Sequence, residues 1–297
     1  MNGVRFSIVG IGFAFLLGCA TPGTRDVADT EACRALSKPA PRASSPRPFY
    51  IVGHNPNTPD RALAFLQAGA NALEPDLRLE GSEIRVRDVV FGGRVRWPLG
   101  GDAGPTLTDY LSGLREKLAQ TKTPAPALIA WDLKPPFEIA WISSALRTIR
   151  AEFGRYYPDT AMLYTAGSKD GIPALKELAA LLVAGEAIGV DDHVAPDRLD
   201  EEFRNLRPPV PYTFSDGTDL TAIAAAVGMR DRGGSYRLVY AWTVNRPETM
   251  HELLVAGVDA MIVDDVPGLC LALTRPQHRA SYRLAVPQDH PFGPALR

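Results

Sequence analysis

The chain has 297 residues and a formal net charge of −2, and 45% of its residues are hydrophobic. This near-neutral balance gives no sign of nucleic-acid binding, and the hydrophobic fraction suits an ordinary globular core. The length fits one large domain or two small ones, because barrels of about 250 residues fold as single domains.

The N-terminus predicts a signal peptide. Arg5 is the only charged residue before an apolar run from Phe6 to Leu17, which is too short for a membrane-spanning helix of about 20 residues. The run ends at Leu16-Leu17-Gly18-Cys19, which resembles a bacterial lipobox. We therefore expect residues 1–18 to be removed and Cys19 to be lipidated, which would place the protein on a membrane of the bacterial cell envelope. A plain secretory signal, with the protein released, is the alternative.

Residues 19–48 form a segment rich in Pro, Ala, Ser and Arg. Such a segment buries little apolar surface and predicts a flexible tether. It contains Cys33, and Cys270 is the other cysteine that would remain besides Cys19. A disulfide between them is allowed outside the cytosol, and two free cysteines are the alternative that the sequence leaves open.

From Phe49 onward, apolar strand candidates alternate with segments of helical periodicity. The first helix is opened by Thr58 and Pro59, a cap and an early proline. The other helix candidates are 107–119, 137–153, 171–182, 220–227 and 247–256. The strand candidates are 49–53, 71–78, 127–133, 160–166, 186–191, 210–215, 237–244 and 259–264.

Eight strands alternating with helices predict an α/β fold, a closed parallel (β/α)8 TIM barrel over residues 49–275. Residues 276–297 are then a C-terminal tail that packs on the barrel. An open doubly wound sheet is the alternative, but no Gly-rich phosphate loop follows the first strand.

Three short stretches at strand ends carry the candidate chemistry: Gly53-His54, Glu74-Pro75-Asp76 and Asp132-Leu133-Lys134. Residues two apart on a strand share a face, and a barrel gathers reactive groups at the C-terminal ends of its strands. Three carboxylates there suit a hard cation, and a histidine adds acid–base chemistry, which is the equipment for cutting a phosphodiester. A solvated rim, or a salt bridge between Asp132 and Lys134 without a metal, is the alternative.

The stretch from Glu80 to Gly104 is long for a simple connection. It is rich in arginine and glycine. We expect either a mobile loop over the barrel mouth or a surface hairpin, because residues 84–87 alternate like a strand.

At these residues the chain resembles the phospholipase C-like phosphodiesterase TIM barrels. This superfamily includes glycerophosphodiester phosphodiesterases and the sphingomyelinase D/phospholipase D toxins, and the later motifs favour the second branch. The matching stretches are 50–54, 69–76, Asp132-Leu133-Lys134, Ser215-Asp216-Gly217, 240–244, 257–262, 283–285 and 289–292. They cover the chain from about Phe49 to the C-terminus.

The resemblance implies a role for each matching residue. Glu74, Asp76 and Asp132 would hold Mg²⁺, which prefers oxygen ligands and keeps waters that a phosphate oxygen can replace. His54 would be one half of an acid–base pair, and Lys134 would neutralise developing phosphate charge. Tyr240 and Trp242 would line the mouth near a choline-type headgroup, where cation–π attraction is effective. Core packing is the alternative role for these two aromatic residues.

The chain departs from the family at one catalytic position. The family carries a second catalytic histidine just after the second strand, and here Arg87 aligns best with it. Arginine stays protonated in proteins and clamps a phosphate, but it does not pass a proton to a leaving group.

The remaining histidines are four. His193 follows Asp191 and Asp192 at the end of the fifth strand candidate, on the predicted active face, where it could supply the proton that Arg87 cannot. An exposed loop position is its favoured interpretation. His251 is expected on the outer surface of a helix. His278 and His290 lie in the tail and are expected to be structural or exposed.

The sequence therefore predicts a metal-dependent phosphoric diester hydrolase or lyase that acts on a phospholipid or lysophospholipid headgroup. Glycerophosphodiester hydrolysis is one alternative. A catalytically impaired barrel that binds phospholipid headgroups or other envelope anions is another, because of Arg87. The protein is expected to act as a monomer, held on the membrane by its lipid anchor.

Overall fold

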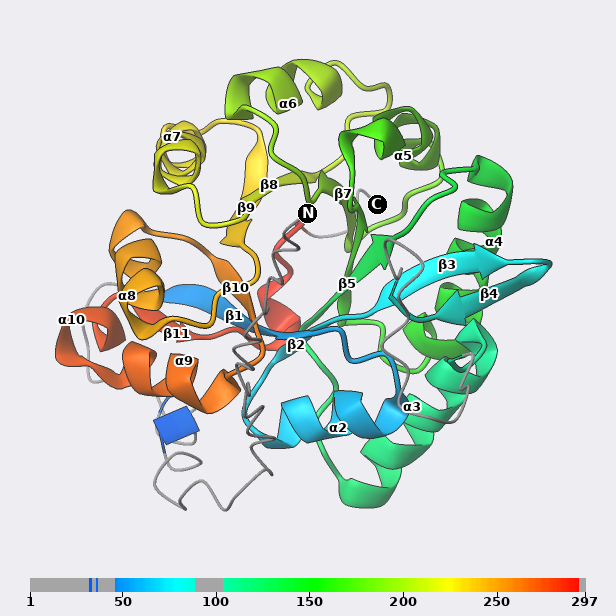
Figure 1. Cartoon of the computed structure of the whole chain (residues 1–297), viewed down its shortest axis with the longest axis horizontal. Coiled ribbons are helices and arrows are strands. Elements are labelled where there is room, and N and C mark those ends of the chain that lie inside the picture. The colour runs from blue at the N-terminus through cyan, green and yellow to red at the C-terminus, as the bar shows by residue number, and fades with distance from the viewer. Residues whose placement is uncertain (1–31, 34–35, 37–45, 89–103, 294–297) are drawn as a thin grey trace, which may run out of the picture.

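The computed structural model describes residues 32–33, 36, 46–88 and 104–293. Its strands form one closed parallel barrel with helices around it (Figure 1). The barrel closes because β1 pairs with β10 on one side and with β2 on the other. The barrel strands are β1 (Arg47–His54), β2 (Ala72–Glu74) continued by β3 (Asp76–Glu80), β5 (Leu128–Leu133), β6 (Ala161–Ala166), β7 (Glu186–Val190), β8 (Tyr212–Asp216), β9 (Tyr236–Ala241) and β10 (Ala260–Val263). The predicted (β/α)8 barrel is confirmed.

Helices follow the barrel strands and cover their outer side. They are α2 (Pro59–Gln67), α3 (Leu107–Thr121), α4 (Ile139–Ile149) with a π-helical turn at Arg150–Gly154, α5 (Ile172–Ala179), α6 (Pro196–Phe203), α7 (Leu220–Asp231), α8 (Pro247–Ala256), α9 (Val266–Thr274) and α10 (Pro276–Arg279). The Thr58 side chain caps α2 as expected, because it accepts a hydrogen bond from the Arg61 N–H at 3.2 Å. The sequence did not indicate α6, whose buried residues are only Pro196, Leu199 and Phe203.

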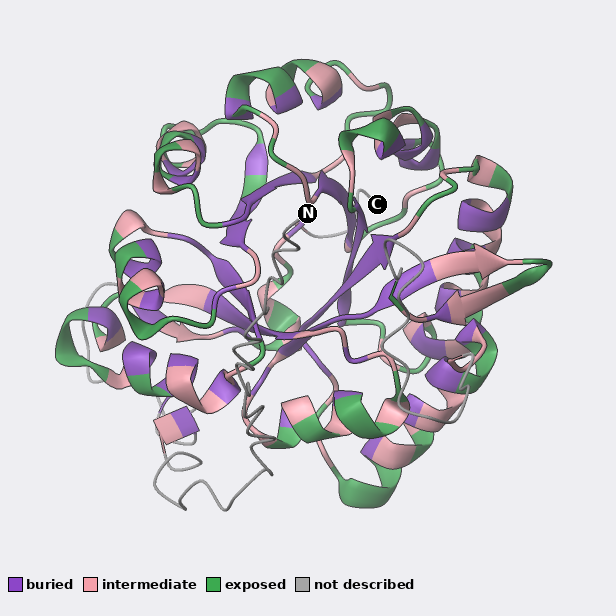
Figure 2. Cartoon of the chain, viewed as in Figure 1, coloured by how far each residue is buried: buried purple, intermediate pink, exposed green. Residues whose placement is uncertain are grey.

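Alternate side chains of each barrel strand point outward to the helices and inward to the centre of the barrel. Residues such as Ile51 and Ile129 face the helices and belong to the main hydrophobic cluster, and Figure 2 shows most of the central barrel strands buried. Their neighbours point inward, where Tyr50 and Leu128 join a second apolar cluster. Further along the same strands the inward positions become polar. The barrel is therefore packed with apolar side chains at its N-terminal end and polar at its C-terminal end.

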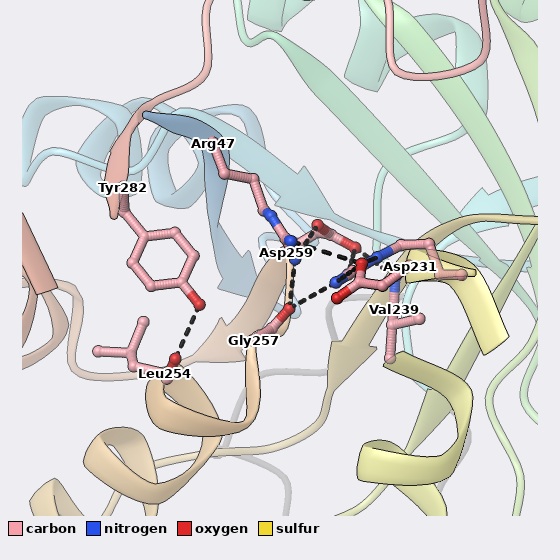
Figure 3. Close-up of polar contacts among 8 residues, drawn as sticks. Arg47, Asp231, Val239, Leu254, Gly257, Asp259 and Tyr282 are labelled. Atoms are coloured by element: carbon pink, nitrogen blue, oxygen red, sulfur yellow. Dashed lines mark hydrogen bonds and ion pairs between the residues drawn. The ribbon is translucent and has the colours of Figure 1, made fainter. Parts of the chain in front are cut away.

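The N-terminal end of the barrel is tied together by the buried carboxylate of Asp259 (Figure 3). It accepts a hydrogen bond from the Val239 N–H at 2.8 Å and pairs with Arg230 of α7. Arg47, at the start of β1, reaches the Asp259 carboxylate at 3.5 Å and donates to the Gly257 carbonyl at 2.7 Å. A buried charge is costly unless it is paired, and here two guanidinium groups pair it across the β1–β10–β9 seam.

The C-terminal tail packs at the same end of the barrel. Strand β11 (Tyr282–Leu284) pairs with the first residues of β1, and the Tyr282 hydroxyl donates to the Leu254 carbonyl of α8 at 2.8 Å (Figure 3). Phe292 belongs to the inner apolar cluster of the barrel. The tail therefore closes the end of the barrel that lies opposite the candidate site.

The arginine-rich stretch after the second strand begins as a hairpin. Strand β3 pairs antiparallel with β4 (Glu83–Val86), as the alternation of residues 84–87 predicted. Residues 89–103, where the expected loop over the mouth would continue, lie outside the described residues.

Cys33 and Cys270 form a disulfide, with their Cα atoms 5.1 Å apart. The bond joins the segment before the barrel to α9, and both cysteines are buried in the main hydrophobic cluster. The pairing that the sequence left open is thus present.

Removing this disulfide is expected to lower the free energy of unfolding by about 2–5 kcal/mol, because the bond closes a very long loop in the unfolded chain. The Cys33→Ser/Cys270→Ser double variant should therefore melt at a lower temperature than the wild type, by about 2–4 °C for each kcal/mol. Dithiothreitol should shift the wild type but not the double variant. A wild-type melting temperature that reductant leaves unchanged would contradict the expectation.

No helix in the described ranges is long and apolar enough to cross a membrane. The predicted signal peptide, the lipidation site Cys19 and most of the predicted tether lie outside the described residues.

Candidate active site

Three carboxylates converge at the C-terminal end of the barrel. One oxygen from each of Glu74, Asp76 and Asp132 lies within 4.8 Å of the others, and all three residues are buried. The local chain explains the convergence, because Pro75 interrupts the strand between Glu74 and Asp76, and Asp76 is in register with Asp132 on β5. The three predicted ligands are thus brought together.

The acidic cluster lacks full electrostatic compensation. Burial raises the pKa of Glu74 well above its ordinary value, and the neighbouring Asp76 and Asp132 charges raise it further. Burial also raises the pKa of Asp76 and brings that of Asp132 to about 7, although Lys134 acts in the opposite direction. The Asp132 Oδ1 atom is buried and has no hydrogen-bond partner among the described residues.

This donor set fits a hard divalent cation. Three buried carboxylates and a carboxylate oxygen without a hydrogen bond are suitable for an ion that takes oxygen ligands and keeps part of its water shell. A cation there would offset the mutual repulsion that raises these pKa values. The predicted metal site is therefore consistent with the geometry.

Lys134 and Asn57 hold the cluster from two sides. The Lys134 Nζ atom lies 2.7 Å from Asp76 Oδ1 and also pairs with Asp132. The Asn57 amide donates to Asp76 Oδ2 at 2.6 Å, while its carbonyl oxygen accepts from the Asp76 N–H at 2.9 Å. Lys134 is thus held against two of the three carboxylates, and Asn57 fixes Asp76.

His54 ends β1 and is oriented by a carboxylate. Its Nδ1 lies 3.0 Å from Asp264 Oδ1, and its Nε2 lies 3.5 Å from the Thr243 hydroxyl. The Asn245 amide donates to the other Asp264 oxygen at 2.7 Å, and its carbonyl accepts from the Asp264 N–H at 2.9 Å. Burial acts to raise the pKa of Asp264, but the hydrogen bonds from His54 and Asn245 outweigh it and lower that pKa. Asp264 therefore stays ionised and orients the imidazole.

A cavity of about 290 Å³ connects these groups. Its lining includes members of the acidic cluster, the imidazole of His54 and the indole of Trp242. The described residues that line it are His54, Asn55, Glu74, Asp88, Asp132, Lys134, Gly167, Asp191, Trp242, Thr243 and Ile262. His54, two of the three clustered carboxylates and the Trp242 ring therefore face one space.

Asp191 adds a buried carboxylate on the wall of this cavity. It accepts hydrogen bonds from the Tyr240 and Ser215 hydroxyls, and burial raises its pKa despite them. The Trp242 indole N–H donates to the Ser215 hydroxyl at 3.2 Å. Tyr240 is thus a buried partner of Asp191, whereas Trp242 lines the cavity.

Arg87, which aligns with the second catalytic histidine of the family, is paired within the β3–β4 hairpin. Its guanidinium lies 3.3 Å from Glu80 of the same hairpin, and its backbone N–H donates to the Asp76 carbonyl at 3.0 Å. Its neighbour Asp88 is among the residues that line the cavity.

The other four histidines lie in three different places. His193, on the segment after β7, lies 2.8 Å from the buried Asp216 and packs against Trp242. His251 and His278 hydrogen-bond each other at 2.8 Å between α8 and α10. His290 lies in the tail that closes the N-terminal end.

The sequence did not single out three side chains that contact the site: Asp191, Asp264 and Asn57. For the first two, the alternation of side chains along a strand was an available signal. Asp191 lies two residues beyond Gly189 on the inward face of its strand, whereas the adjacent Asp192 accepts a hydrogen bond from the Lys169 N–H. Asp264 likewise follows the inward-facing Ile262. Asn57 lies in the turn before α2, and no periodic pattern marks it.

Comparisons with known proteins agree with this geometry. The family model described as "Dermonecrotic toxin SPH" matches residues 213–292. A dermonecrotic toxin from Loxosceles laeta is 25% identical over 297 aligned residues, which cover 84% of this chain and 90% of the toxin. The sphingomyelinase D of Arthroderma benhamiae is also 25% identical, over 86% of this chain and 80% of its own length.

Solved structures show the same barrel. A phosphodiesterase from Oleispira antarctica, in complex with sn-glycerol-3-phosphate, matches with a TM-score of 0.55 at 17% identity and covers 76% of this chain and 97% of its own. A protein from Silicibacter pomeroyi described as a glycerophosphoryl diester phosphodiesterase matches with a TM-score of 0.54 at 15% identity, over 82% of this chain and 97% of its own. The chain is a TIM barrel whose sequence is similar to those of sphingomyelinase D and the dermonecrotic toxins.

Proposed function

We propose that this protein is a divalent-cation-dependent phosphodiesterase that cleaves the headgroup ester of a phospholipid or lysophospholipid. The observation that carries the proposal is the single cavity onto which His54, Glu74 and Asp132 all open. Relatives named sphingomyelinase D and neighbours named as phosphodiesterases support this class of reaction.

Each group has a definite task. A cation bound by Glu74, Asp76 and Asp132, for which Mg²⁺ is the proposed ion, would act as a Lewis acid toward a phosphate oxygen. The Lys134 ammonium, fixed by two of these carboxylates, lies ready to balance the charge that develops on the phosphoryl oxygens. His54 moves the proton, because Asp264 engages its Nδ1 atom and leaves Nε2 on the cavity side, beside the Thr243 hydroxyl.

The opposite wall suits a positively charged headgroup. Trp242 offers an aromatic face, and Asp191 offers a buried carboxylate held by two hydroxyls. A quaternary ammonium group is attracted to both, by cation–π interaction and by direct charge. Choline esters are therefore the proposed substrates, and Tyr240 contributes by fixing Asp191.

Two other functions remain distinct alternatives. Glycerophosphodiester hydrolysis would use the same cavity with a soluble substrate. A phosphate-ester binding protein without turnover would follow if Arg87, which is paired with Glu80, leaves the site short of a proton carrier.

We also propose that Cys19 carries lipid and holds the mature protein on a bacterial membrane. The proposal rests on the Leu16-Leu17-Gly18-Cys19 motif at the end of the apolar run. Palmitate labelling and membrane partition of a Cys19→Ser variant test it. Labelling that persists in this variant would refute it.

The function is tested by offering the purified mature protein sphingomyelin, lysophosphatidylcholine and glycerophosphocholine, each with Mg²⁺ or with chelator. We expect cation-dependent release of headgroup from at least one lipid, and a weaker reaction with glycerophosphocholine. Fastest turnover of glycerophosphocholine would select the first alternative. Saturable binding of all three without hydrolysis would select the second.

A further inference from the structure

The cavity is lined by one histidine, His54, whereas phosphodiester cleavage moves two protons. The nucleophilic hydroxyl must lose a proton, and the leaving alkoxide must gain one. His54 serves one of these transfers. Arg87 serves neither, because a guanidinium remains protonated and this one is paired with Glu80.

All five histidines of the chain lie in the described ranges, and their positions differ. His251 and His278 engage each other on the outer helices. His290 belongs to the tail that closes the opposite end. His193 is the other histidine beside the mouth of the barrel.

His193 is built into a dyad that parallels the one at His54. Its Nδ1 atom lies 2.8 Å from Asp216 Oδ1, and Asp216 is only 3% exposed. This carboxylate engages one ring nitrogen and leaves Nε2 available for proton transfer, as a carboxylate does for the histidine of a catalytic triad. The His193 side chain is 68% exposed, so Nε2 is open to an incoming ligand.

Two neighbours fix where the imidazole lies. Its ring packs against Trp242, with centroids 5.6 Å apart and planes tilted by 43°. Gly217 leaves the room for this packing, because a Cβ atom there would lie 3.2 Å from His193 Cε1. Trp242 also lines the cavity with Glu74 and Asp132. An ester arm that extends from the acidic cluster along the indole therefore ends beside His193.

We propose that His193, oriented by Asp216, is the second acid–base residue of the site and protonates the leaving alcohol. This inference rests on the proposed function. The nucleophile is water or a substrate hydroxyl, and its proton passes to Nε2 of neutral His54 as its oxygen bonds to phosphorus. The ester bond on the other side of phosphorus breaks, and its oxygen takes the proton from Nε2 of His193. Charge and protons balance, and later exchange with solvent restores both imidazoles.

The test compares two leaving groups in the same variants. Lysophosphatidylcholine releases an alkoxide that needs protonation, whereas bis(p-nitrophenyl) phosphate releases a phenolate that does not. His193→Gln should lower kcat on the first substrate by about 10²–10⁴-fold, and on the second by less than tenfold. His290→Gln, at the far end of the barrel, is the matched control and should change neither rate.

Asp216→Asn tests the orienting contact. It should lower the rate on lysophosphatidylcholine more than the rate on bis(p-nitrophenyl) phosphate, as His193→Gln does, but by a smaller factor. It should also shift the alkaline limb of the pH–rate profile. An unchanged melting temperature would show that the fold is intact. Equal losses on both substrates in His193→Gln, or no loss on either, would overturn the inference while leaving the proposed function standing. A wild-type protein that hydrolyses neither ester would overturn both.

Discussion

Replacing Glu74 by Gln is expected to lower kcat/KM on the order of 10³-fold and to weaken cation binding. The change keeps the shape of the side chain and removes one of the three negative charges that converge within 4.8 Å. A bound divalent cation supplies several kcal/mol of transition-state stabilisation, and each ~1.4 kcal/mol is worth a factor of ten in rate. Calorimetric titration with Mg²⁺ and steady-state kinetics measure the two effects separately.

The same substitution should not destabilise the cation-free protein. Glu74 is buried beside two other carboxylates that raise its pKa, so the neutral amide removes repulsion instead of a favourable pair. A Glu83→Gln change on the exposed tip of the β3–β4 hairpin is the control, and it should alter neither cation binding nor activity. Full activity of Glu74→Gln at saturating Mg²⁺ would exclude Glu74 as a ligand.

The pH dependence of stability follows from the same cluster. The pKa of Asp132 rises from 3.8 in the unfolded chain to about 7 in the folded protein. The folded state thus binds more protons within this interval, and the cation-free protein should lose stability as the pH rises through it. Saturating Mg²⁺ should reduce this loss.

Replacing His54 by Ala is expected to lower kcat by about 10²–10⁴-fold with little change in substrate affinity. The imidazole lines the same cavity as Glu74 and Asp132, and its Nε2 atom lies 3.5 Å from the Thr243 hydroxyl. The pH–rate profile of kcat should lose the limb that is due to ionisation of His54. Single-turnover kinetics with lysophosphatidylcholine separate the chemical step from binding.

Asp264→Asn is the informative companion of this variant. It keeps the side-chain shape but removes the charge that orients His54 at 3.0 Å, so we expect a loss of about 10–100-fold, in the range of other substitutions of a supporting carboxylate. His251→Gln is the control variant. It also removes a histidine, but one that lies away from the mouth of the barrel, and it should keep full activity. Equal activity of His54→Ala and the wild type would rule out the assigned role.

The barrel was readable from the sequence because its strands are largely apolar and most of the helices that follow them start with a cap or a proline. Thr58 before α2 and Pro247 at the start of α8 are such signals. The acidic cluster was readable because Glu74 and Asp76 lie two residues apart at a strand end, and Asp132 ends the next barrel strand along the chain.

The contacts between distant strand ends could not be read in the same way. Asp264 reaches His54 across 210 residues of sequence, and Asp216 reaches His193 from the neighbouring strand. A histidine beside a loop gives no local sign of which carboxylate will engage it. The interpretation of His193 as a plain loop residue was reasonable on sequence alone, and the structure adds the buried partner.

The Cys33–Cys270 bond also determines what a proteolytic cut would do. Any single cleavage between residues 33 and 270 would leave two pieces still joined covalently, because each piece retains one of the bonded cysteines. Such a nicked protein would migrate as one species on a non-reducing gel and as two after reduction. If Cys19 is lipidated, both pieces would also stay on the membrane, so damage by envelope proteases would not by itself release the barrel.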